Sequence, residues 1–101
     1  MPLDLENVMK RHAEQAALLM KQLSSPVRLM ILCALIDNEL SVNELNARVT
    51  LSQSALSQHL ARLRHAGLVT RRKEKQTAFY RLKGSEVTQV IAVLKTIYCP
   101  E

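Results

Sequence analysis

The sequence predicts a mainly α-helical domain with one small β-hairpin. Apolar side chains recur at helical spacing in five segments of the 101-residue chain, and two of the middle segments are separated by only a brief turn. Two short strand-like runs, residues 68–73 and 77–82, follow the second of these two around a turn at residues 74–76, which is the pattern of a hairpin. A chain of this length suits one domain with one core. We therefore predict a single winged helix-turn-helix over residues 1–101.

Two helices are expected before the helix-turn-helix. Apolar residues at helical spacing predict a long amphipathic helix over about residues 4–23, which could pack on its own domain or on a second subunit. Ser25 and Pro26 then supply an N-cap and an N1 proline that begin a second helix. That helix is predicted to run from Val27 to about Asp37. Because residues 29–36 are apolar nearly all round, we expect it to be the central buried helix.

The helix-turn-helix itself is predicted over about residues 41–67. Ser41 and Glu44 fit the S-x-x-E capping box that begins a short helix. Ser52 is a natural N-cap for the next helix, and Gly67 is a natural stop after it. Leucines at helical spacing define the buried side of this second helix. They are Leu56, Leu60 and Leu63.

The opposite side of the second helix carries short, neutral polar residues, which suits insertion into a DNA major groove. In a groove, Ser and Gln side chains read base edges, and free N–H groups at a helix N-terminus meet phosphates. An ordinary amphipathic surface helix is the alternative. We expect the base contacts to come from Gln53, Ser54, Ser57 and Gln58, flanked by Ser52 and by His59 at the rim of the groove.

Basic residues are concentrated in and after this helix, where a hairpin, the wing, is predicted over about residues 68–83. The net charge is +5, and residues 62–83 alone hold eight basic residues against one acidic residue. Localised positive charge of this kind points to an anionic partner such as double-stranded DNA. The alternative is a solvated edge hairpin whose charges discourage aggregation. We expect phosphate contacts from Arg62, Arg64, Arg71, Arg72, Lys73 and Lys75.

A last amphipathic helix is predicted over about residues 85–99. Its apolar face and that of the helix over residues 4–23 are too large for so small a domain to bury, so we expect them to form a homodimer interface. The first residues lack the apolar run of a signal peptide, and no apolar run is long enough to cross a bilayer. We therefore expect a cytoplasmic protein with no membrane association. The interface residues expected are Val8, Met9, Ala16, Leu19, Val90, Ile91, Leu94 and Ile97.

Nearly the whole chain resembles the ArsR/SmtB-type winged-helix regulators of bacteria. The most specific similarity lies in residues 51–60, 63–64 and 66–69, and in the predicted wing over residues 72–80. The resemblance implies a transcriptional regulator, often a repressor, that is not an enzyme. It also implies a homodimer that joins through its first and last helices and binds a palindromic operator.

The metal-binding positions of that family are not matched in this sequence. Ser41 and Asn43 stand where one type of site needs cysteines, and the last helix has no histidine where another type needs one. The three histidines of the chain also lack the clustered spacing of zinc ligands. We therefore expect no metal and no cofactor.

The two cysteines are Cys33 and Cys99, which should rest as thiols in the cytoplasm. Taken alone, they are most simply a small core residue and a residue at a helix end. Their placement resembles the thiol-sensing, HlyU/BigR/SqrR-like branch of the family. That resemblance implies redox sensing, in which an oxidant or a reactive sulfur species links the pair through a disulfide or polysulfide and changes DNA affinity. The alternatives are the same regulator without thiol sensing, and a small thiol redox protein, which the lack of a C-x-x-C motif disfavours.

Overall fold

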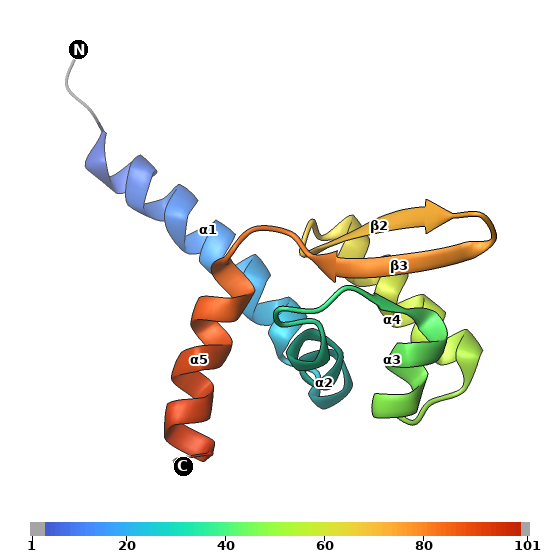
Figure 1. The fold of residues 1–101 in the computed structure, drawn as a ribbon. Helices are drawn as coiled ribbons and strands as arrows, with labels where there is room; N and C mark the ends of the chain where they lie inside the picture. Colours follow the sequence, from blue (N-terminus) through green and yellow to red (C-terminus); the bar gives the residue numbers. More distant parts are fainter. Residues whose placement is uncertain (1–3, 100–101) are drawn as a thin grey trace.

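The computed structural model describes residues 4–99, which form five helices and a three-stranded antiparallel sheet (Figure 1). The helices are α1 (Leu5–Leu23), α2 (Pro26–Ala34), α3 (Val42–Arg48), α4 (Gln53–His65) and α5 (Glu86–Tyr98). The strands are β1 (Leu40–Ser41), β2 (Val69–Glu74) and β3 (Thr77–Leu82). The predicted mainly α-helical fold with one hairpin is confirmed.

A sharp corner separates α1 from α2, whose axes meet at 92°. The buried Arg28 side chain holds this corner: its Nε donates to the carbonyl of Gln22 at 2.8 Å, and its Nη2 donates to the carbonyl of Lys21 at 3.2 Å. These carbonyls lie in the last turn of α1, where a cation is favoured. In the described part of the chain no single helix is long and apolar enough to cross a membrane, and α1 with α2 passes that test only as this bent pair.

Helix α2 is shorter than predicted and is buried on one side only. It ends at Ala34 rather than near Asp37, which adopts a left-handed conformation with φ of 59°. Ile31 is fully buried, whereas Met30 and Cys33 are exposed. Helix α2 contacts α1, α3 and α5, as expected of a central helix, but one of its sides is not buried. Apolar residues around the whole circumference do not reveal which side the core covers.

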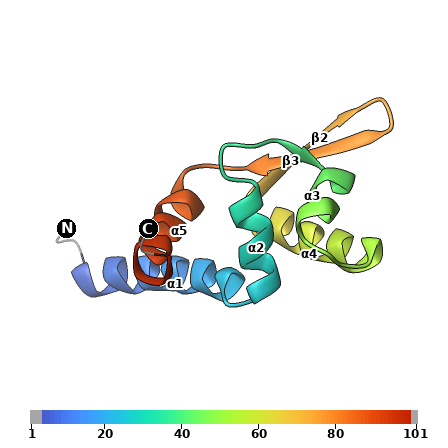
Figure 2. The ribbon, with the colours of Figure 1, turned by 60° about the horizontal axis from the view of Figure 1, so that its bottom comes forward.

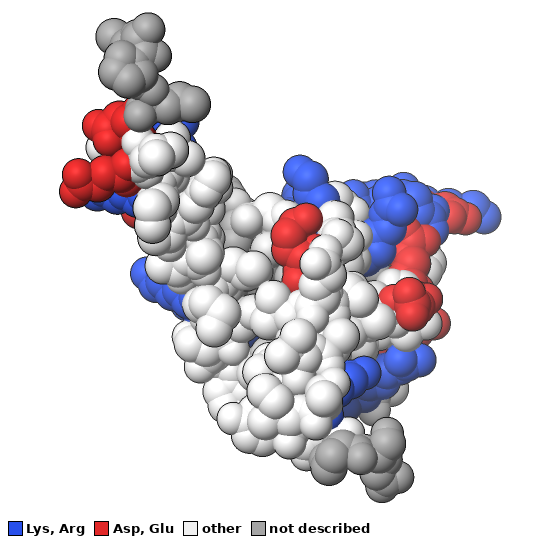
Figure 3. Space-filling model, turned by 90° about the vertical axis from the view of Figure 1, so that its left-hand side faces the viewer, with Lys and Arg blue, Asp and Glu red and all other residues white. Residues whose placement is uncertain are grey.

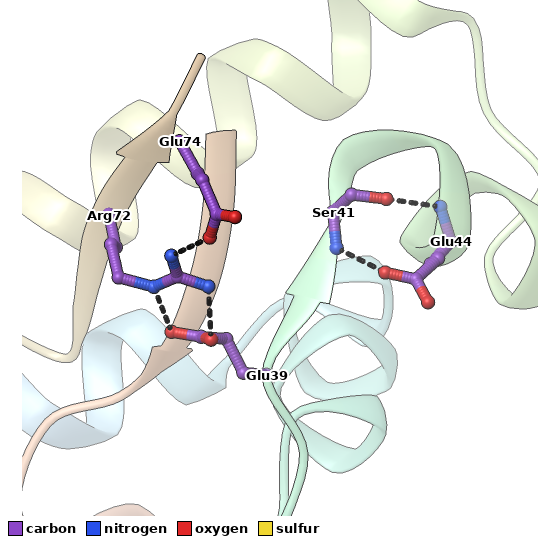
Figure 4. Close-up of polar contacts among 5 residues, drawn as sticks. All are labelled: Glu39, Ser41, Glu44, Arg72 and Glu74. Atoms are coloured by element: carbon purple, nitrogen blue, oxygen red, sulfur yellow. Dashed lines mark hydrogen bonds and ion pairs between the residues drawn. The ribbon is translucent and has the colours of Figure 1, made fainter. Parts of the chain in front are cut away.

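The helix-turn-helix begins with the predicted capping box. The Ser41 hydroxyl accepts the Glu44 backbone N–H at 3.1 Å, and the Glu44 carboxylate accepts the Ser41 backbone N–H at 2.8 Å (Figure 4). The hydrogen bond from the Ser41 backbone lowers the pKa of Glu44. The box therefore satisfies a donor at the start of α3 and connects α3 to β1.

Helix α4 begins and ends where its sequence signals indicate. The Ser52 hydroxyl accepts the backbone N–H of Ala55 at 3.1 Å. At the other end Gly67 adopts φ of 78° and donates its N–H to the carbonyl of Arg64, while the next residue donates to the carbonyl of Leu63. These are the two hydrogen bonds of a Schellman motif. The chain therefore turns directly from α4 into β2.

One hydrophobic core joins α2, α3, α4, α5 and the sheet, and the three predicted leucines of α4 lie within it. Helix α1 contributes only its last residue, Leu23, to the buried set, so most of α1 projects beyond the core (Figure 1). The largest fully buried side chains among the described residues are Ile31, Leu32, Leu35, Leu45, Leu56, Leu60, Leu63, Val69, Val87 and Ile91.

The sheet has the strand order β1-β3-β2. Strand β1 pairs with the middle of β3 through Leu40–Tyr80 and Ser41–Phe79, and β2 pairs with β3 along its whole length. The hairpin of β2 and β3 projects from the helical body (Figure 2). Its tip turns at Lys75, which has φ of 57°. This hairpin is the predicted wing.

Leu60 is fully buried in the core and provides a test of this packing. We expect Leu60→Ala to lower the free energy of unfolding by about 2–5 kcal/mol, because it removes buried atoms and leaves a cavity. Arg64→Ala, on the exposed side of the same helix, should change it by less than about 0.5 kcal/mol. Urea denaturation at one fixed protein concentration measures both. A Leu60→Ala loss as small as the Arg64→Ala loss would contradict this account of the core.

Candidate nucleic-acid interface

The polar side of α4 faces solvent along its whole length. Because the leucines point into the core, the polar side chains on the opposite side are exposed, and among them only His59 is half-buried. No long charged side chain occupies this face before Arg62. The exposed residues of the N-terminal half are Ser52, Gln53, Ser54, Ser57 and Gln58. These side chains are short or uncharged, so a duplex could approach the helix closely.

The wing carries its basic residues on two different faces. Successive side chains of a strand alternate, so Arg71 and Lys73 project from one face of β2, while Arg72 and Glu74 project from the other. All four are exposed. The consecutive basic residues that suggested one phosphate-binding run in the sequence are thus divided between the two faces of the sheet.

Arg72 makes the ion pairs of this region (Figure 4). Its Nε and Nη2 donate to the two carboxylate oxygens of Glu39 at 3.3 and 2.8 Å, and its Nη1 donates to Glu74. The guanidinium carbon lies 4.8 Å from the centre of the Phe79 ring. The hydrogen bonds with Glu39 and Glu74 raise the pKa of Arg72, and the hydrogen bond from Arg72 lowers the pKa of Glu39. Sequence reasoning missed the cluster because Glu39 lies 33 positions away; the alternation along β2 could have indicated only the Glu74 contact.

A second feature is a large apolar face built from α1 and α5. Seven large side chains of these helices are more than half exposed, and Figure 3 shows a broad area without charged residues here. Four predicted interface residues, Val8, Leu19, Val90 and Leu94, are half-buried. Ile91 is only 2% exposed and belongs to the core, so its placement in the interface is wrong. The exposed large residues are Leu5, Met9, Leu18, Met20, Val93, Ile97 and Tyr98.

A hollow of about 830 Å³ adjoins the apolar face, between α1, the end of α4 and the start of α5. Apolar side chains such as Leu18 and Leu19 line it, together with Gln22 and His65. The side-chain oxygen of Gln22 is buried and accepts no hydrogen bond from the described residues. A buried polar atom normally has a partner.

Both cysteines are free thiols on the surface. Cys33 lies in α2 and Cys99 is the residue at the C-terminal cap of α5, and these two helices pack against each other. The interpretation of Cys33 as a small core residue is therefore wrong. Among residues 4–99, no three His, Cys, Asp or Glu side chains come together in a group that could hold a metal ion.

Comparison with known proteins identifies the family. Residues 25–71 match the bacterial regulatory proteins of the arsR family. The chain is also 52% identical over 98 residues to the transcriptional activator HlyU of Vibrio cholerae, a match that covers 97% of this chain and 90% of that protein. The chain belongs to the ArsR family.

Solved structures of ArsR-type regulators share the fold. Reduced HlyU from Vibrio cholerae is 54% identical, with a TM-score of 0.84 over 90% of this chain and 96% of that one. The repressor BigR from Xylella fastidiosa is 40% identical, with a TM-score of 0.86 over 93% and 96% of the two chains. The homodimeric winged helix-turn-helix domain of Mb0332 from Mycobacterium bovis is 26% identical, with a TM-score of 0.76 over 96% and 87%. In this ArsR-family chain, α3 and α4 are therefore the helix-turn-helix, and β2 and β3 are the wing.

Proposed function

We propose that this ArsR-family DNA-binding transcriptional regulator acts in the cytoplasm as a homodimer on a palindromic operator, and that thiol chemistry switches its affinity. The observation that carries the proposal is the exposed neutral face of α4 beside a basic hairpin. HlyU is an activator and BigR a repressor, so these two relatives differ in the sign of regulation. Both relatives regulate transcription, and an activator and a repressor must each recognise their DNA.

The side chains on α4 and on the wing have different tasks in this proposal. Gln53, Ser54, Ser57 and Gln58 read base edges, because a Gln amide can bond in a bidentate manner to adenine and Ser can bond to any base. Cations near them bind phosphates, which position the protein without reading sequence. Those cations are Arg62 and Arg64 on α4, and Arg71, Lys73 and Lys75 on the wing.

The apolar face of α1 and α5 supports assembly with a second copy of the chain. Exposed patches of this size on soluble proteins mark interaction sites. A second copy would cover the face, fill the adjoining hollow and offer the buried Gln22 oxygen a donor. The relative Mb0332 is homodimeric. Two-fold symmetry would then require inverted half-sites in the DNA, about one helical turn apart.

The exposed thiols support the proposed switch. With hydrogen peroxide as the oxidant, the Cys33 and Cys99 sulfur atoms would join in a disulfide, and the two electrons and two protons they lose would reduce the peroxide to two waters. A polysulfide would instead supply two sulfane sulfur atoms: one is inserted between the thiols as a trisulfide, and the other takes the two electrons and two protons and leaves as hydrogen sulfide. A direct bridge requires Cα atoms about 4.4–6.8 Å apart. Either link would restrain α5 against α2, and α2 packs on α3 of the helix-turn-helix. The relative HlyU has been solved in a form named as reduced.

The division between base and phosphate contacts can be tested with duplexes selected by the wild-type protein from a random-sequence library. We expect Gln58→Ala to weaken binding to a selected duplex by about 1–3 kcal/mol and to affect a random duplex much less. Lys73→Ala should weaken both equally and reduce the slope of the salt dependence by about one unit, because the protein then binds one phosphate fewer. Fluorescence anisotropy over a range of salt concentrations measures both. Equally weakened binding to the two duplexes for Gln58→Ala would contradict base readout by this side chain.

Assembly can be tested by sedimentation of the reduced protein at micromolar concentration. We expect a dimer, and we expect Ile97→Asp to produce a folded monomer, because it places a charge on a side chain that is 60% exposed in the isolated chain. Circular dichroism is the control for folding. The selected duplexes should contain two inverted half-sites, and the monomer should lose most of its affinity for them. A wild-type monomer that binds such a duplex tightly would contradict the proposal.

The switch can be tested by treating the reduced protein with peroxide or polysulfide. Mass spectrometry should find an intramolecular link between Cys33 and Cys99, and operator affinity should change about 5–150-fold, the range typical of allosteric coupling. Cys33→Ser and Cys99→Ser serve as matched controls, and neither should respond. Unlinked cysteines after treatment, or a serine variant that responds as the wild type does, would refute the switch and leave a regulator without thiol sensing.

A further inference from the structure

Beyond the core contacts of Val69 and Tyr80 at its base, the wing is linked to the rest of the domain by one cluster of side chains, which we call the wing clamp: Glu39, Arg72, Glu74 and Phe79. Glu39 immediately precedes β1, and Arg72 is in β2, so their bidentate pair joins the two edges of the sheet across β3 (Figure 4). Phe79 of β3 pairs with Arg72 on one side and, on the other, with Ser41, which lies two residues after Glu39. The clamp therefore spans the full width of the sheet.

The guanidinium of Arg72 is already occupied by carboxylates. Glu39 and Glu74 accept hydrogen bonds from all three of its nitrogens. Besides the hydrogen bond from Arg72, the charge of Arg81 also lowers the pKa of Glu39, so the two arginines and two glutamates are neutral together. The hydrogen bond from Arg72 keeps the pKa of Glu39 below its ordinary value, so the carboxylate stays ionised near neutral pH. A phosphate could bind Arg72 only by displacing one of these carboxylates, whereas Arg71 and Lys73 on the opposite face make no ion pair among the described residues.

The wing has few other attachments that could fix its direction. Every residue from 71 to 77 is exposed, so the outer half of the hairpin contributes nothing to the core. Beyond the base of the hairpin, β1 holds the sheet by only two residue pairs. A long, solvated hairpin attached in this way would swing about its base unless a further contact restrained it.

We propose that Arg72 is a wing-positioning residue, held in place by Glu39, and not a phosphate contact. This revises the sequence-based prediction for Arg72. The clamp holds the hairpin at the angle from which Arg71 and Lys73 reach the DNA while α4 lies in the major groove. The inference rests on the proposed DNA-binding function, because the positioning has its effect only when a duplex is bound.

Glu39→Gln gives a test in which a positioning role and simple electrostatics predict opposite changes in DNA affinity. Removal of an acidic charge beside the DNA should by itself tighten binding, because fewer negative charges face the phosphates. Disruption of the clamp should weaken binding. If the wing then keeps its binding orientation for about a third of the time, affinity falls about threefold per wing. Asp37→Asn is the matched control: it removes the same charge from the same loop, does not belong to the clamp, and Asn tolerates the left-handed backbone at this position.

The expected result, measured by anisotropy on a duplex selected by the wild type, is weaker binding by Glu39→Gln and equal or tighter binding by Asp37→Asn. Arg72→Lys should also weaken binding, because a lysine keeps the charge but cannot chelate the Glu39 carboxylate. The salt dependence of binding should stay unchanged in Arg72→Lys. Unchanged or tighter binding by Glu39→Gln, or wild-type affinity in Arg72→Lys, would overturn the proposal.

Hydrogen exchange in the protein without DNA separates this inference from the proposed function. In Glu39→Gln the amides of β2 and β3 should exchange faster, while those of α4 should exchange as in the wild type. Unchanged exchange in the wing would overturn the clamp whatever the binding data show. If the wild-type protein bound no duplex at all, the proposed function would fail, and the exchange rates would still decide whether Glu39 restrains the wing.

Discussion

The burial of three leucines along one side of α4 is the constraint on which the rest of the structure depends. Leu56, Leu60 and Leu63 are each inaccessible to solvent, which fixes the rotation of the helix about its own axis. The short polar side chains on the opposite side must then face outward. Ser52 determines where the helix begins, and Gly67 turns the chain at once into β2. The same few residues therefore place the polar face of α4 and the wing side by side.

The apolar residues of the chain form two separate groups: a buried core and an exposed face on α1 and α5. Those of α2 to α5 and of the sheet fill one core, whereas most of those on α1 lie beyond the corner that Arg28 holds. This corner directs α1 away from the core and leaves an apolar face that α1 shares with α5. In the proposed homodimer, a second copy of the chain covers this face. Cys33 is exposed on α2, which contacts both α5 and α3. In the proposed switch, a change at Cys33 would pass through α2 from the dimer interface to the helix-turn-helix.

Local signals in the sequence predict the structure correctly, and contacts between distant segments escape such prediction. The capping box at Ser41, the cap at Ser52 and the stop at Gly67 depend on neighbouring residues, and the structure has each of them. Where α2 ends and which of its sides is buried depend on the elements that pack against it. Its sequence is apolar nearly all round and so cannot indicate either. The burial of Arg28 and the pairing of Arg72 with Glu39 likewise arise only when the chain folds.

The most direct test of the account is to map amide chemical shifts by NMR while a duplex selected by the wild-type protein is added. We predict that the largest changes fall on residues 52–59 of the α4 region and on residues 71–77 of the wing, with little change on the exposed side of α1. Changes centred on α1 and α5, with α4 unaffected, would contradict the claim that the leucine core orients α4 to read DNA.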